Sequence, residues 1–219
     1  MYTPNFSLER KLHNQGFETI VGIDEVGIGA LAGPVVAAAV FLPFSTRISG
    51  IKDSKKLLAK KRENLYSQIL KLNIKFGIGQ IDPSIIDRIN IYKASQLARK
   101  KAFKDLQDKI GKIDYVLVDG RIRERFGIPS KSIIKGDRLC MSIACASVIA
   151  KVYRDQLISK MDKVYPGYTF SHHKGYGSKE HHRNILRNGV SPIHRKSYGG
   201  VKWFLANKKE YESWVLSSK

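Results

Sequence analysis

Four short apolar runs, separated by longer segments, place the strongest limit on the fold of this chain. They are Glu18 to Val26, Pro34 to Leu42, Ile74 to Ile81 and Tyr115 to Val118. Runs of this length that end at glycine, proline or acidic residues are typical of buried strands. We therefore predict a sheet, in which the first two strands are neighbours because only a short glycine-rich turn separates them.

Helical periodicity fills most of the chain between and after these runs. Leu58, Leu65, Ile69 and Leu72 recur at helical spacing, with lysine and arginine on much of the opposite side. The predicted helical segments are Leu57 to Leu72, Asp82-Pro83 to Ile110, Leu139 to Met161, Ser178 to Arg187 and Val201 to Val215. The combination predicts an α/β fold with a central mixed β-sheet flanked by helices and a helical C-terminal region.

The length and composition favour one domain over residues 1–219. A chain of 219 residues with 42% hydrophobic content can bury one sizeable core, and no linker or repeat interrupts it. Residues 1–17 would form an N-terminal extension and about 200–219 a C-terminal helix. No run approaches the roughly 20 apolar residues of a membrane span, and the N-terminus lacks a signal-peptide core, so we expect a cytoplasmic protein. We also expect a monomer.

The charge of the chain favours a polyanionic partner. Lysine and arginine number 39 against 19 aspartate and glutamate, a formal net charge of +20. Nucleic acid is the first candidate for such a basic protein, although pairs such as Lys60-Lys61 could simply be solvated helix faces. Cys140 and Cys145 are the only cysteines, and their spacing on a predicted helix favours buried thiols over a disulfide.

Acidic residues stand at strand ends or beside glycine in three places. These are Asp24-Glu25, Asp119-Gly120 and Gly136-Asp137. Carboxylates brought together at buried positions repel one another unless a divalent cation neutralises them, an arrangement that metal-assisted phosphodiester hydrolysis requires. Each could instead have a common structural role: Asp119 could open a turn, Asp137 could cap a helix, and Asp24-Glu25 could pair with lysines.

Neighbouring residues of a regular strand face opposite sides of the sheet. Asp24 and Glu25 can therefore serve one site only if the strand bends or bulges there, and Gly27 and Gly29 make such a bend plausible. The histidines 172, 173, 181 and 182 are dense enough to suggest zinc. Their intervals match no common ligand pattern and no cysteine is near, which disfavours a zinc site.

The segment that begins at Gly22, GIDEVGIGALAGPVVAAAV, resembles the signature of the ribonuclease HII family. Six further segments resemble the family in the same order: KDSKKL, VLVDG, KGD, ASVIAKVYRD, HHKGYGSKEH and SPIHR. Together they span nearly the whole chain. The resemblance implies a ribonuclease H-like fold and a metal-dependent endonuclease that cuts the RNA strand of RNA–DNA hybrids.

The resemblance also implies roles for individual residues. Asp24, Glu25 and Asp119 would be the main ligands of Mg²⁺ or Mn²⁺, and Asp137 would complete the site or orient the attacking water. The implied substrate-binding residues are Gly27, Ile28, Gly29, Ser54, Lys55, Lys174, Tyr176, His194 and Arg195. The glycine loop would recognise the 2′-hydroxyl beside the scissile phosphate, Tyr176 would pack against sugar, and the others would contact phosphates or brace the site.

One departure from the family concerns the glycine loop. Most members carry Gly-Arg-Gly or Gly-Lys-Gly where this chain has Gly27-Ile28-Gly29, so a cation beside the substrate is missing, and Ala30 also stands where the family often has another residue. We expect the backbone amides to bind substrate still, with lower affinity or ribonucleotide selectivity.

The expected substrates are RNA–DNA hybrids and duplex DNA with embedded ribonucleotides, cut to 5′-phosphate and 3′-hydroxyl ends during DNA replication and ribonucleotide excision. A sliding clamp is a possible partner, although residues 208–219 show no clear clamp-binding motif. The alternatives are a binding protein without catalysis, or another nuclease of this fold that acts on DNA. Type 3 ribonuclease H is disfavoured because only 23 residues precede Asp24.

Overall fold

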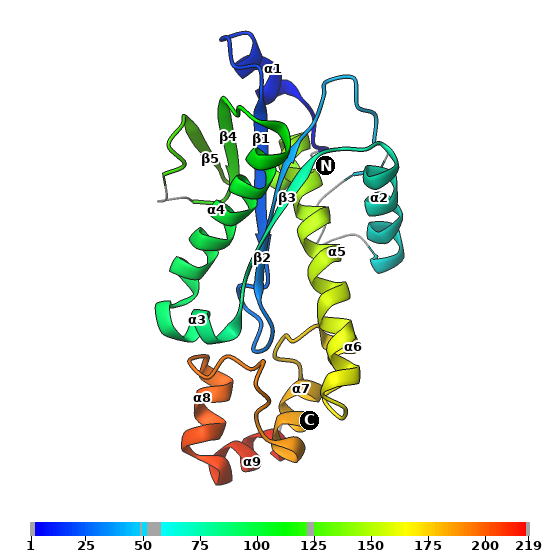
Figure 1. The fold of residues 1–219 in the computed structure, drawn as a ribbon. Coiled ribbons are helices and arrows are strands. Elements are labelled where there is room, and N and C mark those ends of the chain that lie inside the picture. Colours follow the sequence, from blue (N-terminus) through cyan, green and yellow to red (C-terminus); the bar gives the residue numbers. More distant parts are fainter. Residues whose placement is uncertain (1–2, 49, 52–57, 122–124, 218–219) are drawn as a thin grey trace. The chain divides into compact units, whose positions relative to one another are not determined.

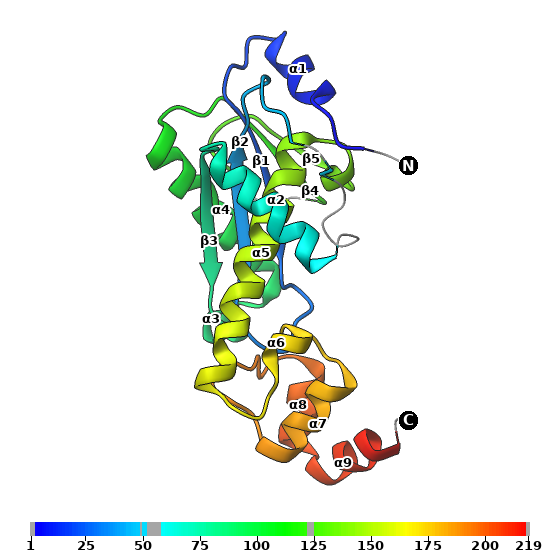
Figure 2. The same ribbon diagram turned by 90° about the vertical axis from the view of Figure 1, so that its right-hand side faces the viewer.

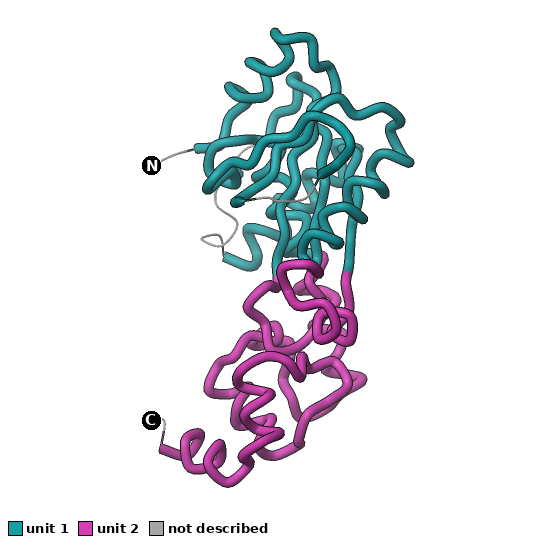
Figure 3. Tube along the Cα trace, turned by 90° about the vertical axis from the view of Figure 1, so that its left-hand side faces the viewer, with its two compact units in different colours: residues 1–26, 36–80, 95–152 teal, residues 27–35, 81–94, 153–219 magenta. Residues whose placement is uncertain are grey.

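The computed structural model describes residues 3–48, 50–51, 58–121 and 125–217. The chain divides into two compact units (Figure 3). The first unit contains Met1–Val26, Val36–Gln80 and Ser95–Val152, and the second contains Gly27–Val35, Ile81–Ala94 and Tyr153–Lys219.

A five-stranded sheet forms the centre of the first unit, with the strand order β3-β2-β1-β4-β5 (Figure 1). The strands are β1 (Ile20–Val26), β2 (Val35–Phe41), β3 (Phe76–Ile81), β4 (Tyr115–Asp119) and β5 (Ser130–Ile133). β1 pairs antiparallel with β2 and parallel with β4, and β4 pairs parallel with β5. The predicted mixed sheet is therefore confirmed, and so is the predicted pairing of its first two strands.

β5 is a strand that the sequence did not indicate. Its residues, SKSI, are exposed or half-buried and alternate weakly, because β5 lies at the edge of the sheet. The other four strands match their predicted ranges to within two residues at each end.

The first unit contains α1 (Ser7–His13), α2 (Ala59–Lys71), the 3₁₀ turn η2 (Gly136–Arg138), most of α4 (Ile91–Ile110) and the first half of α5 (Met141–Val164). α1 lies within the expected N-terminal extension. Its Glu9 is buried and accepts hydrogen bonds from the backbone N–H and the hydroxyl of Ser142, at 3.0 and 2.8 Å. Leu12 joins a buried cluster with Leu117 and Ile143. The extension is thus packed onto the first unit.

Glycines let α4 and α5 approach the sheet closely on opposite faces (Figure 1, Figure 2). A Cβ on Gly22 of β1 would lie 2.4 Å from the backbone nitrogen of Ile143 in α5. A Cβ on Gly79 of β3 would lie 1.9 Å from the backbone oxygen of Ala98 in α4. The backbones touch at these points, so both helices are fixed against the strands.

The second unit is mainly helical. It contains α3 (Pro83–Ile89), α6 (Phe170–His173), α7 (Lys179–Asn188), α8 (Gly199–Ala206) and α9 (Lys208–Ser217). Asp82 takes the N-cap position of α3 and Pro83 its first turn, as predicted. Two predicted helices are each divided: Asn90, with φ of 67°, separates α3 from α4, and Asn207, with φ of −141°, separates α8 from α9.

The break at Asn207 has a packing reason. Tyr211 of α9 is fully buried, and its ring contacts the rings of Phe204 and Trp203 of α8 edge to face. In one continuous helix, residues 203 and 211 would be more than two turns apart, too far for their rings to touch. A turn between two short helices brings the rings into contact.

Two further findings concern the cysteines and membrane-spanning helices. Cys140 and Cys145 are both free thiols and both buried, which confirms the prediction for them. Within the described part of the chain, no helix has the length and apolar character needed to cross a membrane.

The close contact at Gly79 generates a stability prediction. Gly79→Ala should lower the free energy of unfolding by about 1–3 kcal/mol, because the methyl group would force β3 away from the backbone of α4. Urea unfolding measures the change.

Gly199→Ala is the matched control. A Cβ at Gly199 would meet nothing within 4 Å, and Gly199 opens α8, so we expect a change within about 0.5 kcal/mol. An unchanged unfolding midpoint for Gly79→Ala would contradict the close packing of β3 on α4.

Candidate active site

Asp24 and Asp119 are brought side by side by strand register. β1 and β4 run parallel, and their last paired residues are Ile23 and Val118, so Asp24 and Asp119 follow next on the two strands in the same register. Opposite residues of parallel neighbours point to the same face of a sheet. Asp24 shares that face with Gly22, two residues before it, and Gly22 lies against α5. Both carboxylates therefore belong to the α5 face.

Asp137 joins this face through η2. The backbone N–H of Gly136 donates to Oδ1 of Asp119 at 2.6 Å, which holds η2 against the end of β4. Asp137 follows directly and is 5% exposed, while Asp24 is 3% exposed. Three of the four predicted acids thus come from β1, β4 and η2, with two of them buried.

Glu25 is held on the other face. The register of β1 with β2 continues without interruption to Val26, so the bend that Asp24 and Glu25 would need in order to serve one site is absent. Regular alternation then directs Glu25 toward α4, where Nη1 of Arg99 lies 2.9 Å from its Oε2. Both side chains are about nine-tenths buried. Arg99 is a site residue that the sequence did not indicate, because nothing in a basic helix distinguishes one arginine from its neighbours.

The acid cluster fits a hard divalent cation by its donor chemistry. Carboxylate oxygens are the ligands that Mg²⁺ and Mn²⁺ prefer, and buried carboxylates favour a cation nearby. Within the described residues, no three His, Cys, Asp or Glu side chains are already arranged to hold a metal ion. The fit therefore rests on donor type, burial and strand placement.

The predicted substrate-binding residues that the structure describes all lie in the second unit. The loop of residues 27–35 is fixed there by Gly175, whose backbone oxygen accepts from the N–H groups of Leu31 and Ala32 at 2.8 and 3.2 Å. Ala30 pairs with Tyr176 in an isolated antiparallel bridge. The glycine loop and the Tyr176 segment thus form one local assembly. Ser54 and Lys55 lie outside the described residues.

Lys174 and Arg195 have partners within the protein. The ammonium of Lys174 donates to the hydroxyl of Ser159 at 2.6 Å. Arg195 is fully buried and donates to the backbone oxygens of Gly33 and Ile28, at 3.0 and 2.9 Å. Of the two roles expected for Arg195, contact with phosphate or bracing, its burial supports bracing of the glycine loop.

Three histidines form a buried network behind Tyr176. His181 Nδ1 lies 2.9 Å from the backbone oxygen of Tyr176, which can only accept, so this nitrogen donates. His194 Nδ1 accepts from the N–H of Ser191 at 3.0 Å. Nε2 of His194 must then donate to Nε2 of His181, 3.0 Å away. Each ring is therefore neutral, and each ring nitrogen is used.

His173 completes the network. Its Nε2 donates to the backbone oxygen of Tyr168 at 2.8 Å, its Nδ1 accepts from the N–H of Gly175 at 3.2 Å, and its ring stacks on His181 at 4.1 Å. The sequence showed the histidines but could not show that they pair with one another and with Ser191.

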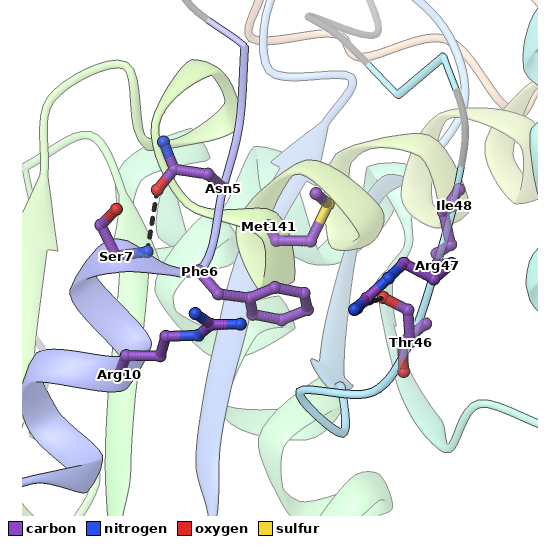
Figure 4. Close-up of a pocket in the computed structure, with 8 residues that line it drawn as sticks. All are labelled: Asn5, Phe6, Ser7, Arg10, Thr46, Arg47, Ile48 and Met141. Carbon is purple, nitrogen blue, oxygen red and sulfur yellow. Dashed lines mark hydrogen bonds between the residues drawn. The ribbon is translucent and has the colours of Figure 1, made fainter.

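A surface pocket of about 290 Å³ lies elsewhere in the first unit (Figure 4). The pocket is lined by the apolar side chains of Phe6, Ile48 and Met141 and by two arginines, Arg10 and Arg47. Its described lining residues include none of the predicted site residues, so the candidate site is the acid cluster and not this pocket.

The histidine network generates a pH prediction. Burial lowers the pKa of His181 to about 3 and that of His194 to about 4, and it also lowers the pKa of His173. In the unfolded chain, histidine titrates near 6.5. The stabilisation is therefore complete above about pH 6.5 and is lost as the pH falls toward 4. At pH 5 the loss should be about 2 kcal/mol for each of His181 and His194.

Tryptophan fluorescence during urea unfolding at pH 7 and pH 5 measures this loss. Both tryptophans, Trp203 and Trp214, lie in the second unit and report on it. His13 is exposed, so His13→Gln should leave the pH dependence unchanged. Equal stability at the two pH values would show that the network is not neutral.

Comparison with known proteins agrees with this geometry. Residues 21–201 match the family model described as ribonuclease HII. Among solved structures, the ribonuclease H2 from Pyrococcus horikoshii OT3 has a TM-score of 0.70 at 23% identity, covering 92% of this chain and all of that one. A chain of the PCNA:RNase HII complex from Archaeoglobus fulgidus has a TM-score of 0.68 at 25% identity, covering 83% and 96%.

Bst-RNase HIII in complex with Mn²⁺ has a TM-score of 0.69 at 20% identity, covering 90% of this chain and 72% of that chain. These likenesses confirm the predicted ribonuclease H-like fold. The family model covers both the strand-end acids and the glycine loop, and it extends over far more than half of the sequence. The chain therefore belongs to the ribonuclease HII family and is a ribonuclease H, a hydrolase.

Proposed function

We propose that this ribonuclease H hydrolyses the RNA strand of RNA–DNA hybrids and also cuts on the 5′ side of ribonucleotides embedded in duplex DNA, leaving 5′-phosphate and 3′-hydroxyl ends. The observation that carries the proposal is the register of β1 and β4, which places Asp24 opposite Asp119, with Asp137 held beside them by the Gly136–Asp119 hydrogen bond. Asp24 and Asp119 thus share one face of the sheet, and Asp137 directly follows a residue that is hydrogen-bonded to Asp119.

The acids would hold two divalent ions, Mg²⁺ or Mn²⁺. Such ions supply an activated water and neutralise the leaving oxygen during phosphodiester hydrolysis. Asp24 and Asp119 would be the central ligands because they share a face, and Asp137 would complete the site or orient the water. Glu25 faces the side of β1 opposite to Asp24, so it would join them only through a local bend of the strand that also releases its contact with Arg99.

The second unit would hold the nucleic acid. The backbone of Gly27, Ile28 and Gly29 would bind at the ribose, and Tyr176 would pack against the following sugar. Lys174, His194 and Arg195 would brace these segments through the contacts described above, and Ser54 and Lys55 would contact phosphates. Because Ile28 carries no charge, Ile28→Arg should tighten binding or sharpen ribonucleotide preference.

We propose that residues 1–219 act as one catalytic domain, because the family match spans segments of both units. Roles in primer removal and ribonucleotide excision, in the cytoplasm, would follow from the substrates. The Archaeoglobus fulgidus ribonuclease HII occurs in a complex with PCNA, which makes a sliding clamp the first protein partner to test, beside action as a monomer.

Cleavage of a duplex that contains one ribonucleotide tests the function. With Mg²⁺ or Mn²⁺ the protein should cut 5′ of the ribonucleotide and should also cut a uniform RNA–DNA hybrid, but not an all-DNA duplex. Asp119→Asn should lower the cleavage rate at least about a hundredfold, because the neutral amide weakens the metal site. Asp108→Asn, an exposed acid of α4 paired with Lys104, is the control and should cut normally.

Two outcomes would redirect the proposal. Cutting of the all-DNA duplex would assign the chain to a DNA nuclease. Tight binding of the hybrid without cleavage at any metal concentration would favour a binding protein that has lost catalysis.

The Glu25–Arg99 contact predicts how metal affinity responds to substitution. Arg99→Met removes a buried positive charge 2.9 Å from a proposed ligand and keeps the bulk of the side chain. Mn²⁺ should then bind about three- to tenfold more tightly, since less positive charge opposes it. Isothermal titration of Mn²⁺ into the metal-free protein measures the change.

Lys100→Met removes a positive charge from the exposed side of the same helix and should change Mn²⁺ affinity less than about twofold. Weaker Mn²⁺ binding by Arg99→Met would mean instead that Arg99 holds Glu25 in place for the metal.

A further inference from the structure

Two buried arginines lie beneath the glycine loop. Arg154 donates from Nε to the backbone oxygen of Pro34 at 2.9 Å, and from Nη2 to that of Ala32 at 3.0 Å. Its Nη1 donates to the backbone oxygen of Lys174 at 2.9 Å. Arg195 donates to the oxygens of Gly33 and Ile28. Four carbonyl groups of one loop are therefore directed at two guanidinium groups.

The space under the loop is filled by these side chains. Gly27 has φ of 92°, and a Cβ there would lie 2.3 Å from Nε of Arg154. Tyr198 lies against Arg195, with the guanidinium 4.9 Å from its ring centre, and its hydroxyl also donates to the backbone oxygen of Ile28. Only glycine at position 27 allows the loop to close over the arginine.

The two positive charges have little compensation from the described acids: Asp155 favours the charged form of Arg154, and no described carboxylate does so for Arg195. Both side chains are fully buried, and no described carboxylate forms an ion pair with either of them. Nη2 of Arg195 is buried and finds no acceptor among the described residues. Burial lowers the pKa of Arg195 only to about 10, so it stays charged at neutral pH. Buried charge of one sign is costly in the free protein, and a bound anion would relieve that cost.

The loop presents the amide of Gly29 on the side away from Arg195. A trans peptide is planar, so the carbonyl of Ile28 and the N–H of Gly29 point in opposite directions. The Ile28 carbonyl points to Arg195, and the Gly29 N–H therefore points away from it. Ile28 and Gly29 are exposed, and no described residue accepts a hydrogen bond from either N–H group.

We propose that Arg154 and Arg195 are positioning residues that make the Ile28–Gly29 turn a binding site for one phosphodiester group of the nucleic acid. They fix the carbonyls inward and supply from below the positive charge that the side chain of Ile28 lacks. The phosphate would be bound by the amides and would not touch either guanidinium. The inference rests on the proposed function, because nucleic acid is taken as the ligand.

Pairs of variants separate charge from hydrogen bonding. Arg195→Lys keeps the charge and loses the planar fork, whereas Arg195→Gln keeps an amide donor and loses the charge. Binding of an RNA–DNA hybrid is measured without metal, by fluorescence anisotropy at several salt concentrations. The dissociation constant should rise about tenfold for Arg195→Gln and less than about threefold for Arg195→Lys, with a smaller salt dependence for the Gln variant.

Lys196→Gln, which removes the neighbouring exposed charge, should change the dissociation constant less than about twofold. The same Lys and Gln pair at Arg154 repeats the test if an Arg195 variant fails to fold, as judged by tryptophan fluorescence. Inorganic phosphate provides a second probe. It should raise the thermal midpoint of the wild type and of the Lys variants more than that of the Gln variants.

Equal weakening of binding by the Lys and Gln variants at both positions would overturn the inference and leave the arginines a hydrogen-bonding role alone. Unchanged binding in all the variants would also overturn it. Failure of the proposed function is distinguishable from failure of this inference. It would appear as absence of metal-dependent cleavage by the wild type, whatever the order of the Lys and Gln variants in binding.

Discussion

The parallel pairing of β1 with β4 is the constraint on which the proposed chemistry depends. A shift of one residue in that register would turn Asp119 to the opposite face from Asp24. Gly22 supports the register from one side, because it lets the start of α5 touch β1 and so sets η2, with Asp137, at the end of β4. The positions of Asp24 and Asp119 thus follow from backbone pairing, and Asp137 is placed by a hydrogen bond from the preceding residue to the side chain of Asp119.

The second unit is organised by a different principle, the satisfaction of buried polar groups. Arg154 and Arg195 fix the glycine loop through its carbonyl groups. The neutral histidines fix the Tyr176 segment, in which His181 donates to the backbone oxygen of Tyr176. Gly175 joins the two by accepting from Leu31 and Ala32. The glycine loop and Tyr176, which the family resemblance assigned to the substrate, are therefore arranged by buried residues that need not touch it.

The sequence alone predicted those elements in which an apolar run coincides with a strand of the sheet. The runs that became β1, β2 and β4 are largely buried, the run that became β3 alternates between buried and half-buried residues, and β1 and β4 carry Asp24 and Asp119 where the pattern placed them. The sequence did not predict those features that tertiary contacts determine. The edge strand β5 has too little apolar pattern, Asn90 and Asn207 interrupt helices that periodicity joined, and the unbroken ladder of β1 turns Glu25 toward Arg99. None of these depends on local propensity.

The central claim is that the acids of β1, β4 and η2 hold the metal while the glycine loop holds the strand. A crystal structure of the protein with Mn²⁺ and an RNA–DNA hybrid, with the metal located by its anomalous signal, tests it most directly. We expect Mn²⁺ bound by the carboxylates of Asp24 and Asp119, and a phosphate or ribose hydroxyl at the Gly29 N–H. Mn²⁺ bound at other side chains, or a hybrid that leaves the loop untouched, would contradict it.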